Sequence, residues 1–145
     1  MRIYFSASIS GGRGQAHLYP PIITHLKGYG EVLTEFVADL IHTRMGEQDR
    51  TPEAIYQRDL DLVATCDVLV AEVTGPSLGV GVEVAEAGRL GKPVLALLQP
   101  REGRRLSAMI AGDPNVSVAE YDTLEEAQGA VDAFFQGLAS GAGKI

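Results

Sequence analysis

A glycine-rich stretch from Val73 to Glu83 is the clearest place where this sequence could bind a ligand. Thr74 and Ser77 supply hydroxyl groups, while Gly79 and Gly81 allow the backbone to approach a ligand closely. If a helix begins at the end of this stretch, its free amide groups and the positive end of its dipole favour an anion. The glycine spacing matches neither a Walker loop nor a complete GxGxxG motif. On these residues alone, anion binding and simple helix capping therefore both remain open.

Three residues have side chains that could take part in catalysis: Glu83 at the end of this stretch, and Asp59 and Tyr4 in two other segments. Glu83 falls in about the first turn of the expected helix, where it either acts on a ligand or complements the helix dipole. Asp59 lies on the apolar stripe of its own predicted helix. A carboxylate is costly to bury there unless it has a use or a partner such as Arg58. Tyr4 lies in the first predicted strand. It is either a core residue or a residue whose hydroxyl group reaches a carboxylate.

The composition limits the kind of protein. With 145 residues, 46% of them hydrophobic and 21% charged, we expect a single domain over residues 1–145. The 19 acidic and 12 basic residues give a net charge of −7, which argues against a nucleic-acid polymer as partner. No apolar run reaches the ~20 residues of a membrane span, so no membrane partner is expected. The single Cys66 excludes an internal disulfide and fits a cytoplasmic location.

Segments typical of strands alternate with helical segments along the chain. The predicted strands are 2–7, 31–36, 67–73, 94–98 and 116–121. The first predicted helical segment reaches about residue 28, with a kink or break at prolines 20 and 21. The other predicted helices cover 51–65, the segment from the end of the glycine-rich stretch to residue 90, 104–111 and 123–138. Residues 39–50 are predicted to be irregular. This pattern predicts an α/β fold: a doubly wound (Rossmann/flavodoxin-like) five-stranded parallel sheet with helices on both faces. Functional residues are expected in the turns after the first, third and fourth strands.

Several separated blocks of the sequence, in the same order, resemble one family. They are Ile3-Tyr4-Phe5, Ser8-Ile9 with Gly11-Gly12-Arg13, Ala71-Glu72-Val73-Thr74, Pro76 to Gly81 with Glu83, and Leu106 to Ile110. The family is that of the 2′-deoxynucleoside 5′-phosphate N-hydrolases, within the nucleoside 2-deoxyribosyltransferase superfamily. The resemblance implies cleavage of the N-glycosidic bond of a deoxynucleoside monophosphate, giving free base and deoxyribose 5-phosphate. It also implies that Glu83 is the nucleophile, that Asp59 holds the sugar and that Tyr4 orients Glu83.

The resemblance further implies a substrate-binding set whose serines bind the 5′-phosphate. Its members are Ser8, Ile9, Ser10, Gly11, Ser77, Gly79 and Ser107. Ser107 is implied to reach the site from the other subunit, so we expect a homodimer. The sequence departs from the family at two positions, where Ser10 replaces a common arginine and Phe36 replaces a common histidine beside the base. Phosphate affinity and base preference are therefore not carried over.

Two other functions compete with hydrolysis. Deoxyribosyltransferases of the same superfamily pass the sugar to a second base, but usually carry an acid where Ser77 stands and an asparagine near the C-terminus. A small domain that only binds a nucleotide would have no use for a carboxylate on a buried stripe. The three histidines, His17, His25 and His42, have no metal-ligand spacing, and we expect neither a metal nor a cofactor.

Overall fold

The computed structural model describes residues 1–9, 14–40, 47, 49–103 and 105–141. In this part of the chain, a parallel sheet has the strand order β2-β1-β3-β4-β5. Its strands are β1 (Arg2–Ala7), β2 (Glu31–Val32), β3 (Val68–Glu72), β4 (Val94–Leu98) and β5 (Val116–Glu120). The predicted doubly wound, five-stranded parallel sheet is confirmed. The strand order reverses between β1 and β3, and ligands bind at such switch points in open α/β sheets.

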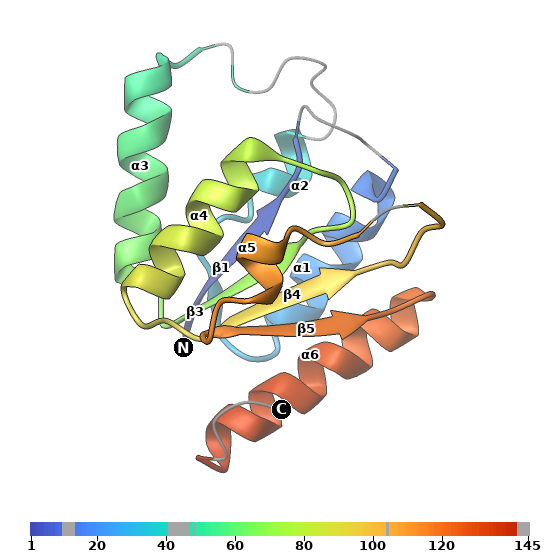
Figure 1. Cartoon of the computed structure of the whole chain (residues 1–145). Helices are drawn as coiled ribbons and strands as arrows, with labels where there is room; N and C mark the ends of the chain where they lie inside the picture. The colour runs from blue at the N-terminus through green and yellow to red at the C-terminus, as the bar shows by residue number, and fades with distance from the viewer. Residues whose placement is uncertain (10–13, 41–46, 48, 104, 142–145) are drawn as a thin grey trace.

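Helices cover both faces of the sheet (Figure 1). They are η1 (Ala16–Leu18), α1 (Tyr19–Leu26), α2 (Val37–Leu40), α3 (Pro52–Thr65), α4 (Leu78–Arg89), α5 (Ala108–Ala111) and α6 (Leu124–Ala139). On one face α1 lies against α6, with α2 beside α1 and β1. On the other face α4 lies between α3 and α5. None of the described helices is long and apolar enough to cross a membrane.

The alternation of β1 decides which of its side chains reach each face of the sheet. Ile3 and Phe5 are fully buried in the core that includes residues of α1 and α6. Tyr4 belongs to the opposite core, with Val63 of α3 and Val80 of α4. Because side chains alternate along a strand, Ser6 lies on the same face as Tyr4. Tyr4 and Ser6 therefore both face α3 and α4.

The helix that carries Asp59 begins and ends as predicted. Thr51 caps α3 by accepting a hydrogen bond from the amide of Ala54 at 3.2 Å, and Pro52 takes the first helical position. The fixed φ of proline suits this position, and its missing N–H group would have no partner there. The helix therefore runs over Pro52–Thr65 and holds Asp59 near its middle.

Three boundaries differ from the prediction. The predicted strand 31–36 stops after Val32, and the chain then turns into α2, which was not predicted. The predicted helix 104–111 is reduced to the four residues of α5, and residue 104 lies outside the described residues. A kink or break was expected at prolines 20 and 21. Both prolines instead occupy the first turn of α1, and the helical segment is interrupted before Tyr19, where η1 ends.

Thr34 explains why β2 is so short. Its hydroxyl accepts a hydrogen bond from the amide of Phe5 and donates one to the carbonyl of Phe5, both at 2.8 Å. A side chain thus takes the place that the next backbone pair of the ladder would occupy. Thr34 is 1% exposed, so these groups of β1 have no access to water as an alternative partner.

We predict that Thr34→Val lowers the free energy of unfolding by about 1–3 kcal/mol, because it leaves the buried amide and carbonyl of Phe5 without partners. Urea unfolding followed by circular dichroism measures this change. The same substitution at the exposed Thr24 serves as the control and should change stability by less than about 0.5 kcal/mol. Equal stability of the Thr34 variant and the wild type would contradict this account of the strand end.

Candidate active site

In the structure, the Glu83 side chain contacts Tyr4 and Ser6 of β1. Glu83 is partly buried in the second turn of α4, and the Ser6 hydroxyl donates a short hydrogen bond to its Oε2 atom. It also shares a hydrogen bond with the Tyr4 hydroxyl. The prediction placed Glu83 in about the first turn, where the helix dipole acts most strongly. Because this effect falls off beyond the first turn, the dipole alone does not explain the position of Glu83.

The environment of Glu83 raises its pKa to about 7. The largest cause is burial, which disfavours the ionised form. The negative charge of Asp59 raises the pKa further, while the hydrogen bonds from Ser6 and Tyr4 and the positive charge of Arg58 lower it. The carboxyl group therefore changes its ionisation near neutral pH, which is a common property of catalytic carboxylates.

Tyr4 keeps its proton throughout the physiological range. It is 2% exposed, and burial together with the negative charges of Glu83 and Asp59 raises the pKa of its hydroxyl far above the usual value. A protonated tyrosine can only donate to an ionised carboxylate. Tyr4 therefore favours the ionised form of Glu83 and limits the directions in which its carboxylate can point.

Asp59 lies on α3 and contributes a second carboxyl group to the same site. Its charge affects the pKa values of both Glu83 and Tyr4, and burial raises its own pKa. The guanidinium of Arg58 donates to Asp59 Oδ1 at 2.8 Å and lowers this pKa. Asp59 is thus paired with Arg58, as one of the two sequence-based interpretations expects, and its charge also acts on Glu83 and Tyr4. Its catalytic role stays a prediction.

The first group of predicted substrate-binding residues follows β1. Ser8 is 1% exposed, and its carbonyl accepts a hydrogen bond from the Tyr19 hydroxyl at 3.2 Å. Ile9 is partly buried beside it. Ser10 and Gly11, the other two predicted residues of this turn, lie outside the described residues.

The second group lies at the starts of α4 and α5. Ser77 and Ser107 cap these helices, and both line one cavity of about 1460 Å³. Tyr4, Asp59 and Glu83 are not among the residues that line this cavity, although Val80, Gly81 and Val84 of the helix that carries Glu83 are. A Cβ atom at Gly79 would meet only the Ser77 hydroxyl, at 3.9 Å, so the backbone here leaves room for a ligand.

Ser6 is the residue of this site that the sequence analysis missed. Its signal was present, since it lies two residues after Tyr4 in a strand and alternation places both on one face. A serine in a strand has many structural uses, and nothing in the sequence indicates that α4 crosses β1 at this point. Contact with Glu83 is what distinguishes it.

Glu72 is another residue with a carboxyl group to which the sequence analysis gave no role. It is fully buried at the end of β3, and its Oε1 atom accepts hydrogen bonds from the Thr74 amide at 3.2 Å and the Tyr121 hydroxyl at 3.1 Å. Burial raises its pKa, and its Oε2 atom has no hydrogen-bond partner among the residues that the structure describes. The Thr74 hydroxyl in turn accepts from the amide of Gln99 at 2.7 Å. Glu72 thus ties the start of the glycine-rich stretch to the ends of β4 and β5.

The described residues do not form a cluster of three or more histidine, cysteine, aspartate or glutamate side chains that could hold a metal ion. The chemistry of this site is that of carboxyl and hydroxyl groups. A shielded carboxylate near pKa 7 can act as a nucleophile or as a general acid or base.

A doubly wound sheet with such a carboxylate beside its switch point is typical of enzymes that act on small molecules. The model of the nucleoside 2-deoxyribosyltransferase family matches residues 3–129. The chain therefore belongs to this family, and the predicted family relationship is confirmed.

Curated relatives cover most of the chain. A 5-hydroxymethyl-dUMP N-hydrolase of Rattus norvegicus is 45% identical over 131 residues, which are 90% of this chain and 79% of the relative. The protein of the same name from Esox lucius is 42% identical over 144 residues, 95% of this chain and 98% of the relative. That from Homo sapiens is 41% identical over 138 residues, 92% and 79% respectively.

A solved structure supports the fold. The structure of a CMP N-glycosidase of Clostridium botulinum superposes with a TM-score of 0.68 and covers 92% of this chain and 99% of its own. The two sequences are 19% identical, so this likeness concerns the fold alone.

The raised pKa of Glu83 predicts a specific dependence of stability on pH. The folded state binds the proton of Glu83 more tightly than the unfolded state, whose pKa is 4.5, so this group stabilises the fold at low pH. That stabilisation is lost as the pH rises from 4.5 to about 7. We predict that Glu83→Gln increases the free energy of unfolding relative to wild type, and that this gain grows by about 2–3 kcal/mol between pH 5 and pH 8.

Urea unfolding at a series of pH values measures this difference. Glu86→Gln on the same helix is the matched control, because Arg89 lowers the pKa of Glu86 and the trend with pH should be absent. A constant difference between wild type and the Glu83 variant across this range would contradict the burial of an ionisable Glu83.

Proposed function

We propose that this protein hydrolyses the N-glycosidic bond of 2′-deoxynucleoside 5′-monophosphates and releases free base and deoxyribose 5-phosphate. The observation that carries the proposal is the Glu83 carboxyl group, shielded and held by Ser6 and Tyr4, with a pKa of about 7. The names of the curated relatives support the same reaction class, since 5-hydroxymethyl-dUMP is a deoxynucleoside monophosphate.

In the proposed mechanism, the ionised Glu83 attacks C1′ of the sugar. The bond between C1′ and the base nitrogen breaks, the base leaves with the electron pair and takes up a proton, and a bond forms between C1′ and Glu83. Water then attacks C1′, releases the carboxylate and passes its proton to solvent. Tyr4 and Ser6 hold the carboxylate in place, and Asp59 binds the 3′-hydroxyl group of the sugar.

The phosphate is proposed to bind at the turns that follow β1 and β3. Ser8 and Ile9 lie at the first turn, and Ser77 and Gly79 at the second, where the free amides of α4 favour an anion. For Ser10 and Gly11 the proposal depends on the family resemblance alone.

Transfer of the sugar to a second base is the competing activity, because the family is named for it. Ser77 argues for hydrolysis, since its hydroxyl caps α4 where the transferases usually carry an acid. A protein that only binds nucleotides would not need a shielded carboxylate near pKa 7.

We predict that purified protein releases free base from deoxynucleoside monophosphates, including 5-hydroxymethyl-dUMP, faster than from the matching ribonucleotides. The ribose 2′-hydroxyl makes the oxocarbenium-like transition state less stable. Glu83→Gln should reduce turnover by about three orders of magnitude, equivalent to about 4 kcal/mol of barrier, whereas Glu86→Gln should not. Chromatography of the released base measures both.

Three results would contradict the proposal. Base exchange that outpaces hydrolysis when a second free base is present would identify a transferase. Nucleotide binding without turnover by the wild type would identify a binding domain. Full activity of the Glu83 variant would remove the nucleophile from the mechanism.

We propose that the enzyme is a homodimer in which Ser107 serves the partner's active site. Within one chain Ser107 lines a cavity that Glu83 does not line. Leu78 at the start of α4 is 93% exposed and Met109 in α5 is 85% exposed, and both line the cavity that holds Ser107. Large apolar side chains exposed together often mark a protein interface.

Mixing two inactive variants tests this arrangement. If Ser107 crosses the interface, dimers formed from Glu83→Gln and Ser107→Ala chains contain one intact site, and activity should return after the chains exchange. If Ser107 serves its own chain, every site keeps one defect and no activity returns. Met109→Glu should give a monomer in analytical ultracentrifugation, with Tyr56→Glu on the exposed face of α3 as control.

We further propose that residues 1–145 work as one domain in the cytoplasm, without metal or cofactor. The single cysteine, Cys66, is buried and free, as suits a reducing compartment. The proposed reaction uses only carboxyl and hydroxyl groups, water and substrate.

A further inference from the structure

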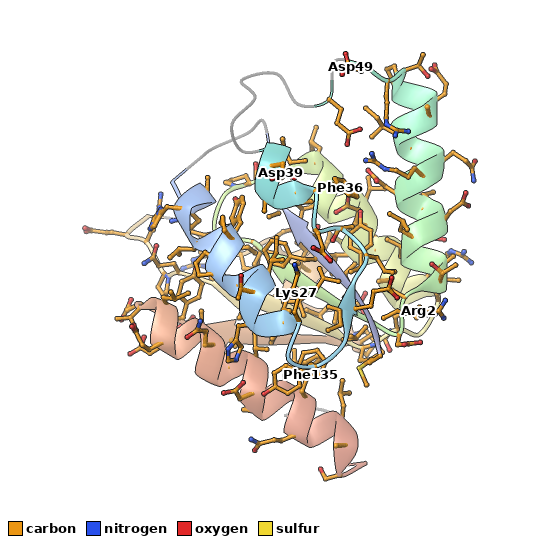
Figure 2. The ribbon with its side chains drawn as sticks, turned by 180° about the vertical axis from the view of Figure 1, so that it is seen from behind. Arg2, Lys27, Phe36, Asp39, Asp49 and Phe135 are labelled. Carbon is orange, nitrogen blue, oxygen red and sulfur yellow. The ribbon has the colours of Figure 1, made fainter. Side chains whose placement is uncertain are left out.

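Arg58 joins the catalytic face of α3 to two segments that precede this helix in the sequence. Its Nε and Nη2 atoms both lie 2.8 Å from Asp59 Oδ1, and its Nη1 atom donates to Glu47 Oε2 at 2.7 Å. Its guanidinium carbon lies 4.4 Å from the centre of the Phe36 ring. Figure 2 shows Phe36 just before α2, on the side toward α3. One side chain thus contacts three others that belong to different segments.

The contact between Arg58 and Asp59 is not a local property of the helix. Adjacent residues of an α-helix point in different directions, so Arg58 must fold back to reach its neighbour. Phe36 and Glu47 hold it in this position by a cation–π contact and an ion pair. The side chains of Arg58, Asp59 and Glu47 are 22%, 19% and 13% exposed, so water screens their charges less than on an open surface.

Arg58 contacts only one of the two carboxylate oxygens of Asp59. Both contacts from Arg58 go to Oδ1, which leaves Oδ2 as the oxygen that Arg58 does not hold. A carboxylate fixed on one oxygen presents the other in a defined direction. That is the arrangement needed to bind a sugar hydroxyl group beside Glu83.

We propose that Arg58 is a positioning residue of this reaction, which fixes Asp59 and supplies the positive charge that favours ionised Glu83. This inference rests on the proposed function. In this proposal, Phe36 and Glu47 act indirectly, because they hold the Arg58 side chain in place. Arg58 does not touch substrate in this proposal and acts through the two carboxylates.

The charges around Glu83 predict the direction in which its pKa changes when Arg58 is removed. Tyr4 and Ser6 of β1 and Asp59 and Arg58 of α3 face it, and Arg58 is the cation among these four. Arg50 lies one step further out, where its Nε atom is 3.3 Å from Glu47 Oε2. Arg58 lowers the pKa values of both Glu83 and Asp59, so its removal must raise them.

The test compares Arg58→Gln, Arg58→Lys and a matched control, Arg89→Gln, which breaks an exposed arginine–glutamate pair on α4. Arg58→Gln should lower kcat about tenfold to a hundredfold with a smaller change in KM. It should also move the acidic limb of the pH profile upward by about half a unit or more, part of the ~1–3 units that a directly paired charge gives. Arg58→Lys should keep the limb and recover only part of kcat, because lysine lacks the planar fork. Arg89→Gln should behave as wild type.

Carbon-13 NMR titration of the glutamate carboxyl groups, with Glu83→Gln to assign the resonance, reads the pKa of Glu83 without any turnover. An unchanged Glu83 titration and pH limb in Arg58→Gln would overturn the inference, even if activity or stability fell. If that variant fails to fold, Arg58→Lys decides, and full kcat in it would overturn the inference. Absence of turnover in the wild type would refute the proposed function instead, and would leave the titration to test the charge effect.

Discussion

The candidate active site depends on holding an ionisable carboxyl group out of water between α4 and β1. Burial raises the pKa of Glu83 to about 7, and the hydroxyls of Ser6 and Tyr4 offset part of that cost by hydrogen bonding to it. Each of the three side chains comes from a regular element rather than a loop. Strand alternation and the position of α4 therefore set the site with little freedom, which is the preorganisation that a reacting group needs.

Charge balance around this carboxyl group extends beyond the residues that form hydrogen bonds with it. Asp59 brings a second negative charge, and Arg58 compensates it while Glu47 and Phe36 hold Arg58. A site with two neighbouring carboxyl groups needs such a cation, because like charges at short range raise each other's pKa. The positions of α2 and α3 relative to each other thus bear on the ionisation of a residue on α4.

Periodicity predicted much of this arrangement, and its limits are physical. The strand alternation placed Tyr4, and the helical stripe singled out Asp59, because both depend only on neighbours in the sequence. The end of β2 at Thr34, the role of Ser6 and the folding back of Arg58 depend on which elements approach one another in space. The same holds for Glu72, which reads as one residue of an apolar strand but joins the ends of three strands. The roles of Ser77 and Ser107 in binding the phosphate stay predictions.

The brevity of β2 also protects the molecule. An edge strand offers a row of unpaired amides and carbonyls to which the strand of another molecule can add. Here the edge consists of Glu31–Val32 alone, and the Thr34 side chain closes the ladder next to it. An incoming strand could pair with only a few residues here, so that unwanted growth of the sheet is discouraged at this edge.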